Sequence, residues 1–251
     1  MATYLLDLDG TMYHGTKIIP AAKTLVNCLQ EKRQAFYFLT NNASRTPQEN
    51  AEHMHSIGFS GIESKQFFNA AMACISYLKQ NFSERKVMMV GENGLAYELK
   101  RQGFVLVRNY ADFVVVGLNR FADYQLYSLA LQNLLDGAKL VATNADRLLL
   151  SQDGVNIGNG SVVKMLEYAS NQQALITGKP ETIFLQEALS YFNLDKQEVI
   201  LVGDNLETDI QCGINSGVKT IFVLGGVHDI KDIERLKIVP DRIISSLSEL
   251  L

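Results

Sequence analysis

Two aspartates stand at the end of the first apolar run of the chain. The run Tyr4–Leu8 is typical of a buried strand, and Asp7 and Asp9 lie two residues apart where it ends, followed by Gly10 and Thr11. Neighbouring carboxylates repel one another, and burial raises the cost of keeping them ionised. The pair therefore either lies in a solvated turn or binds something positively charged.

Polar side chains also follow three later strand-like runs. These stretches are Thr40–Asn42, Gly178–Pro180 and Gly203–Asp209, which supply hydroxyls, amides, a lysine and further acids. In open α/β sheets, ligands bind beyond the carboxyl ends of the strands, so we expect all four stretches to converge on one edge. Mg²⁺ prefers oxygen ligands and shares substrate phosphate oxygens with the protein. The sequence therefore predicts a magnesium and phosphate site.

Each acid has a role that its chemistry allows. Asp7 and Asp204 offer two carboxylates to Mg²⁺, and the cation would offset their mutual repulsion. A carboxylate beside that metal, such as Asp7, can attack a phosphoryl group and form an aspartyl-phosphate. Asp9 can protonate the leaving oxygen and later activate water.

Hydrogen-bond donors complete the set. Thr40, Asn41 and Lys179 can donate to the phosphoryl oxygens, where the transition state carries its negative charge. Taken singly, each motif also occurs without any chemistry, as a turn, a helix cap or a solvated helix start. Four of them in order, each after a predicted strand, favour the functional interpretation.

Short β-rich runs alternate with longer amphipathic stretches, which predicts an α/β fold with a mostly parallel sheet and helices on both faces. The expected strands are Tyr4–Leu8, Ala35–Leu39, Val87–Val90, Phe113–Val116, Leu140–Ala142, Val199–Val202 and Thr220–Val223. The expected helices are Pro20–Lys32, Gln48–Ile57, Asp123–Leu135 and Pro180–Phe192.

The composition is that of an ordinary globular protein. Of the 251 residues, 47% are hydrophobic and 20% are charged, and the net charge of −4 gives no electrostatic reason to expect nucleic-acid binding. Three scattered cysteines without a C-x-x-C pair favour a reducing compartment. No apolar run approaches the roughly 18 residues of a membrane span. We therefore expect a cytoplasmic protein without a membrane partner.

Together the motifs resemble the four signatures of the haloacid dehalogenase (HAD) superfamily, and they span most of the chain. The residues that carry this resemblance are Asp7-Leu8-Asp9-Gly10-Thr11, Thr40, Lys179, Gly203-Asp204 and Thr208-Asp209. The resemblance implies a three-layer Rossmann-like core and Mg²⁺-dependent phosphoryl transfer through an aspartyl-phosphate on Asp7. Asp9 would be the general acid/base and would give its backbone carbonyl to the metal.

The resemblance also implies roles for the other residues of the site. Asp204 would bind Mg²⁺ together with Asp7, and Asp209 would support these metal ligands. The phosphoryl group would be bound by Asp9, Thr40, Asn41, Lys179 and Asn205. Because dehalogenases of the superfamily lack the second aspartate, Asp9 favours a phosphatase or a mutase.

The spacing of the motifs predicts an inserted domain. The interval between Asp7 and Thr40 is short, whereas the interval between Thr40 and Lys179 is far longer than one helical connection needs. We therefore expect a discontinuous catalytic core, residues 1–79 and 177–251, with an α/β cap over residues 80–176. Similar mutases carry their cap in the first interval, so a phosphatase fits better. Segments along the whole chain, including "FLTNNASRTP" and "VGDNLETDI", resemble the NagD-type phosphatases, also called p-nitrophenylphosphatase-type.

The identity of the substrate stays open at this stage. Such phosphatases act on small phosphorylated metabolites, so sugar or acid-sugar phosphates and nucleoside monophosphates are both expected substrates. Asn144 and Asp146 are candidate cap residues, although a simple turn explains them equally well. Similar enzymes form dimers through the cap, so a homodimer is one expectation. The alternatives are a phospho-accepting signalling module and an inactive binding protein on the same scaffold.

Overall fold

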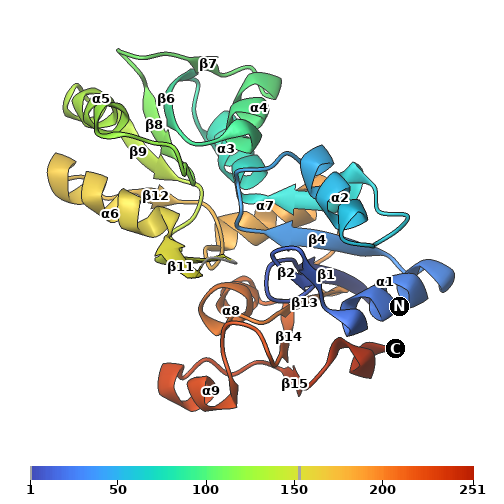
Figure 1. Ribbon diagram of the computed structural model, residues 1–251. Helices are drawn as coiled ribbons and strands as arrows, with labels where there is room; N and C mark the ends of the chain where they lie inside the picture. Colours follow the sequence, from blue (N-terminus) through green and yellow to red (C-terminus); the bar gives the residue numbers. More distant parts are fainter. Residues whose placement is uncertain (1, 152–153) are drawn as a thin grey trace. The chain divides into compact units, whose positions relative to one another are not determined.

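The computed structural model describes residues 2–151 and 154–251, which form two compact units (Figure 1). The first unit comprises Met1–Thr40, Pro47–Phe68 and Lys179–Leu251, and the second comprises Asn41–Thr46 and Asn69–Gly178. Within the described ranges, no helix combines the length and apolar character that a bilayer crossing requires.

A six-stranded sheet forms the centre of the first unit, in the order β15-β14-β13-β1-β4-β5. Its strands are β1 (Thr3–Asp7), β4 (Phe36–Thr40), β5 (Phe67–Asn69), β13 (Val199–Gly203), β14 (Lys219–Val223) and β15 (Arg242–Ile244). The central strand β1 pairs in parallel with both β13 and β4. Parallel pairing aligns the carboxyl ends of these strands, so the residues that follow them meet at one edge.

Helices cover both faces of this sheet. On one face Phe36 and Phe38 pack in the same buried cluster as α1 (Pro20–Glu31) and α2 (Pro47–Ser56). On the other face the intervening Tyr37 stacks on Phe192, the last residue of α7 (Thr182–Phe192). The remaining helical elements of the unit are α8 (Gln211–Ser216), α9 (Ile230–Leu236), the π-helical turn Leu206–Ile210 and the 3₁₀ turns Ser64–Gln66 and Leu247–Leu250. A short hairpin of β2 (Tyr13–His14) and β3 (Lys17–Ile18) follows β1.

The second unit contains its own five-stranded sheet, in the order β12-β9-β8-β6-β7. The strands are β6 (Lys86–Val90), β7 (Val105–Leu106), β8 (Phe113–Val116), β9 (Lys139–Ala142) and β12 (Leu175–Ile176). A separate two-stranded sheet pairs β10 (Leu148–Ser151) with β11 (Gly154–Ile157) in antiparallel orientation. The helices are α3 (Ala70–Asn81), α4 (Asn93–Arg101), α5 (Tyr124–Leu135) and α6 (Asn159–Ser170). Buried residues of α5 and α6 share one cluster with Val114 and Val116, while Phe113 meets Phe82 at the end of α3 on the opposite face.

The predicted α/β fold with parallel sheets is confirmed, and every expected strand is present to within a residue or so at each end. The helix expected from Pro180 begins at Thr182. The second unit also differs from the predicted cap over residues 80–176, since it contains Asn41–Thr46 and extends from Asn69 to Gly178. The extension to Asn69 arises because Asn69 caps helix α3, which we did not predict, and this helix packs within the second unit.

Candidate active site

Three carboxylates meet at the carboxyl edge of the first sheet. Asp7 is the last residue of β1, Asp204 follows β13, and Asp209 lies on the π-helical turn after it. One oxygen of each can be chosen so that all three lie within 4.8 Å of one another, and all three residues are buried. Since β1 and β13 are neighbouring parallel strands, residues that are almost 200 positions apart share this edge.

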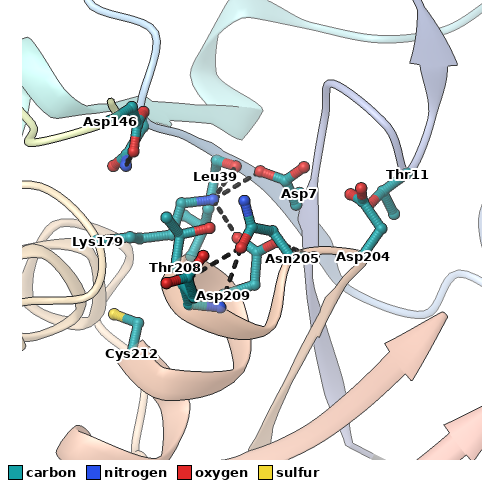
Figure 2. A network of polar contacts seen from close by, with 12 residues as sticks. Asp7, Thr11, Leu39, Asp146, Lys179, Asp204, Asn205, Thr208, Asp209 and Cys212 are labelled. Atoms are coloured by element: carbon teal, nitrogen blue, oxygen red, sulfur yellow. Dashed lines mark hydrogen bonds and ion pairs between the residues drawn. The ribbon is translucent and has the colours of Figure 1, made fainter. Parts of the chain in front are cut away.

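Lys179 supplies the positive charge of the cluster (Figure 2). Its ammonium donates to Asp7 Oδ1 and to Asp209 Oδ1, both at 2.6 Å, and more weakly to the Leu39 carbonyl at 3.4 Å. The side chain is 2% exposed. Burial alone would lower the pKa of Lys179, but the carboxylates of Asp209 and Asp7 outweigh that effect and raise it. The lysine is therefore a permanent cation within the cluster.

One ammonium does not balance three carboxylates. Burial, together with the charge of Asp209, raises the pKa of Asp7 well above its usual range, even though Lys179 acts in the opposite direction. Burial and Asp209 also raise the pKa of Asp204 to about 6. When Lys179 and the three carboxylates are all ionised, the cluster has a net charge of −2. A divalent cation would neutralise this charge.

Two loops contact the Asp204 carboxylate closely. Thr11 donates its hydroxyl to Asp204 Oδ1 and the Val227 N–H donates to Oδ2, both at 2.7 Å. A Cβ on Gly10 or on Gly226 would lie 2.3 or 2.0 Å from Oδ2, so neither position accommodates a side chain. This carboxylate is held in one orientation by two separate loops.

The donor set of this cluster fits a hard divalent cation. It consists of carboxylate oxygens only, it is buried, and its negative charge is only partly offset by Lys179. Of the predicted metal ligands Asp7, Asp9 and Asp204, the first and the last lie in this cluster, together with Asp209. Asp9 has an exposed side chain and is expected to offer its backbone carbonyl, so its contact with the metal stays a prediction.

Two other predicted residues belong to the same unit. Thr40 is buried at the end of β4, next to β1, where Asp7 pairs with Leu39. The Asn205 side chain is the N-cap of the π-helical turn, since its Oδ1 accepts from the N–H groups of Glu207 and Thr208. A phosphate contact by the Asn205 side chain stays a prediction.

The remaining candidates, Asn41, Asn144 and Asp146, lie together in the second unit. The Asn41 amide donates to both carboxylate oxygens of Asp146, at 3.1 and 3.2 Å, and the Asn144 amide donates to the Asn41 carbonyl at 2.8 Å. Asn144 also accepts from the Asp146 N–H. These bonds join Asn41 to the segment that carries Asn144 and Asp146, and a substrate contact by any of the three stays a prediction.

The loop after β14 was not among the segments predicted to form the site. Its residues Gly226, Val227 and His228 all lie against Asp204. The Gly225-Gly226 pair directly after a predicted strand was the available signal, because adjacent glycines mark a close backbone approach. The donor itself is a backbone N–H, which any residue type other than proline provides.

The raised pKa of Asp204 predicts a pH-dependent stability. Without a cation, ionising Asp204 costs the folded state more than the unfolded one, and this cost grows as the pH rises from about 4 to about 6. We expect Asp204→Asn to stabilise the metal-free protein by about 1–2 kcal/mol at pH 7.5 and not at pH 4.5. Mg²⁺ should raise the unfolding temperature of the wild type more at pH 7.5 than at pH 5.0, and should not raise that of the variant. Thermal unfolding by circular dichroism measures both, and an equal effect of Mg²⁺ on the variant would contradict the assignment.

Lys179→Met should strongly destabilise the metal-free protein at pH 7.5. The substitution leaves Asp7 and Asp209 buried without their counter-charge, and breaking a buried ion pair in this way costs about 3–5 kcal/mol. Urea unfolding gives the free energy of unfolding. The matched control is Lys65→Met, which removes an exposed pair with Glu63 and should leave the unfolding midpoint unchanged. Equal stability of the two variants would argue against Lys179 as the charge that holds the cluster together.

Comparisons with known proteins identify the family of the chain. Residues 4–105 match the haloacid dehalogenase-like hydrolase family, and residues 176–250 match the HAD-hydrolase-like family. The chain is 35% identical to the 5'-nucleotidase YutF of Bacillus subtilis, over 98% of this chain and 96% of that protein, and 32% identical to an acid sugar phosphatase of Staphylococcus saprophyticus, over 99% and 96%. The crystal structure of a double-mutant thermostable NPPase from Geobacillus stearothermophilus superposes with a TM-score of 0.92 at 34% identity, over 99% of this chain and 97% of that one. The chain therefore belongs to the haloacid dehalogenase superfamily, among its NagD-like phosphatases.

Proposed function

We propose that the protein hydrolyses small phosphate monoesters through an aspartyl-phosphate on Asp7, with Mg²⁺ as cofactor. The observation that carries this proposal is the buried cluster of Asp7, Asp204 and Asp209 around Lys179 at the carboxyl edge of the sheet. Such a cluster combines a candidate nucleophile, the ammonium of Lys179 and uncompensated negative charge in one place. The names of the relatives, a 5'-nucleotidase and an acid sugar phosphatase, support the same reaction class.

In the first half of the reaction, a carboxylate oxygen of Asp7 attacks phosphorus. A bond forms between that oxygen and phosphorus, and the ester P–O bond breaks. Asp9, whose exposed side chain follows β1, donates its proton to the leaving alcohol oxygen. Lys179 donates to Asp7 and thereby opposes the rise of the Asp7 pKa that burial causes, which favours the ionised nucleophile.

In the second half, water replaces Asp7 on phosphorus. Asp9, now ionised, takes the proton of the attacking water, the bond between Asp7 and phosphorus breaks, and inorganic phosphate leaves. Lys179 and Thr40 are the groups that we assign to the phosphoryl oxygens, since Lys179 donates to Asp7 and Thr40 ends the strand that pairs with β1 beside Asp7. Mg²⁺, held by Asp7, Asp204 and the Asp9 carbonyl, would neutralise negative charge on the phosphoryl group.

The two aspartates should have separable effects on catalysis. Asp7→Asn removes the nucleophile and should abolish Mg²⁺-dependent hydrolysis of p-nitrophenyl phosphate. Asp9→Asn removes the proton donor and should slow the turnover about 10²–10⁴-fold. Colour release at 405 nm measures both rates, and circular dichroism controls for folding.

The same variants test the alternative of a phospho-accepting signalling module. That alternative requires phosphorylated Asp7 to be long-lived and to show no hydrolysis that depends on Asp9. Mass spectrometry of acid-quenched protein would detect the phosphorylated Asp7. Wild-type hydrolysis rates in the Asp7→Asn variant would overturn the proposed nucleophile.

A panel of phosphorylated metabolites should define the substrate class. We expect phosphate release from nucleoside monophosphates or from sugar and acid-sugar phosphates, and no release after treatment with EDTA, since the acidic cluster would then lack its cation. Malachite-green detection measures the released phosphate, and Asp7→Asn protein is the blank. Hydrolysis of phosphodiesters alone would contradict a phosphomonoesterase.

A further inference from the structure

The loop that follows β14 forms one wall around Asp204. Val227 lies on this loop and donates its N–H to Asp204 Oδ2 at 2.7 Å, and Gly226 leaves no space for a side chain beside the same oxygen. A backbone N–H can hold a carboxylate only if the loop that carries it is itself held in place. The residue that follows Val227 has the contacts for this purpose.

His228 is 9% exposed and bonds to the segment around Asp204 through three atoms. Its backbone N–H donates to the Asp204 carbonyl at 3.4 Å, and its Nδ1 accepts from the Leu206 N–H at 3.2 Å. Its Nε2 lies 3.5 Å from Glu207 Oε2. Because Nδ1 accepts a hydrogen bond, the neutral ring carries its proton on Nε2.

The partner of Nδ1 is itself fixed. Leu206 is fully buried and packs in one cluster with Ile210 and Phe222. It is also the first residue of the π-helical turn that carries Asp209, so its N–H is one of the donors that a helix start leaves without a helical partner. The His228 ring therefore ties the loop after β14 to a rigid part of the acidic cluster.

We propose that His228 is a positioning residue which, through Nδ1, keeps the Val227 N–H on Asp204 and so sets the affinity of the acidic cluster for its divalent cation. The inference rests on the proposed function insofar as that cation is Mg²⁺. The ring nitrogen matters here as an acceptor for a backbone N–H. The contact between Nε2 and Glu207 contributes little, because the Glu207 side chain is 58% exposed and solvent screens it.

Two substitutions separate the ring nitrogens. Asparagine carries its oxygen on Cγ, as histidine carries Nδ1, so His228→Asn keeps an acceptor for the Leu206 N–H. Glutamine carries its oxygen one bond further out, near the position of Nε2, so His228→Gln loses that acceptor. Glu207→Gln is the matched control for the contact on the other side of the ring.

Isothermal titration calorimetry of substrate-free protein with Mg²⁺ is the first measurement. We expect His228→Gln to weaken Mg²⁺ binding about tenfold, the lower end of the effect of losing a group that orients a metal ligand. His228→Asn and Glu207→Gln should stay within about twofold of the wild type. The unfolding temperature of each metal-free variant is recorded beside its affinity, so that a loss of folding is not taken for a loss of binding.

Hydrogen exchange of the metal-free protein is the second measurement, and it does not depend on Mg²⁺. The Leu206 and Val227 amides should exchange faster in His228→Gln than in His228→Asn. Equal Mg²⁺ affinities and equal exchange in these two variants would overturn the role of Nδ1 while leaving the proposed phosphatase intact. Absence of Mg²⁺ binding in the wild type would instead overturn the cofactor of the proposed function and the effect of His228 on cation affinity.

Discussion

A single buried ammonium between two carboxylates is the constraint on which the site depends. Lys179 bonds to Asp7 and Asp209 at the same distance, and all three side chains are removed from solvent. Buried charges are tolerated only when they are paired, and here the pairing is incomplete because Asp204 adds a third acid. The protein thus retains a local excess of negative charge at the edge of its sheet. This excess distinguishes the cluster from a closed salt bridge and is the reason that we propose it as the site of a divalent cation.

The backbone around the cluster is shaped by the same constraint. A carboxylate that is buried with an unfavourable charge needs donors on its oxygens, and Asp204 receives one from the Thr11 hydroxyl and one from the Val227 N–H. Both loops approach so closely that Gly10 and Gly226 have no room for a Cβ. The order of the strands, the glycines and the capped π-helical turn can all be understood as ways to bring donors to these acids.

Much of this arrangement could be predicted from the sequence, for a physical reason. Strands that are buried on both faces are continuous runs of apolar residues, so Val199–Val202 and its neighbours are easy to recognise, and the acids that directly follow them must lie at the sheet edge. The pairing of Lys179 with Asp209 was not predicted, because a lysine after a strand can reach several neighbours. Asn205 is chemically suited to a ligand, yet its oxygen caps a helix.

The contribution of the loop after β14 could not be predicted for a different reason. Its donor is the main chain of Val227, and residue type says almost nothing about where a backbone N–H points. The role of His228 depends on which ring nitrogen faces Leu206, and the orientation of the ring is set by tertiary packing rather than by residue type.

The topology of the first sheet also determines when the site can exist during synthesis. Strand β1 leaves the ribosome before either of its neighbours, and one of them, β13, starts only at Val199. The whole second unit, which ends at Gly178, is translated before that neighbour. Until then the nascent chain carries a central strand with one side unpaired, a state that is prone to pair with other chains. A stop codon after Gly178 and before Val199 would therefore leave a chain with a complete second unit and an open, unfinished first sheet.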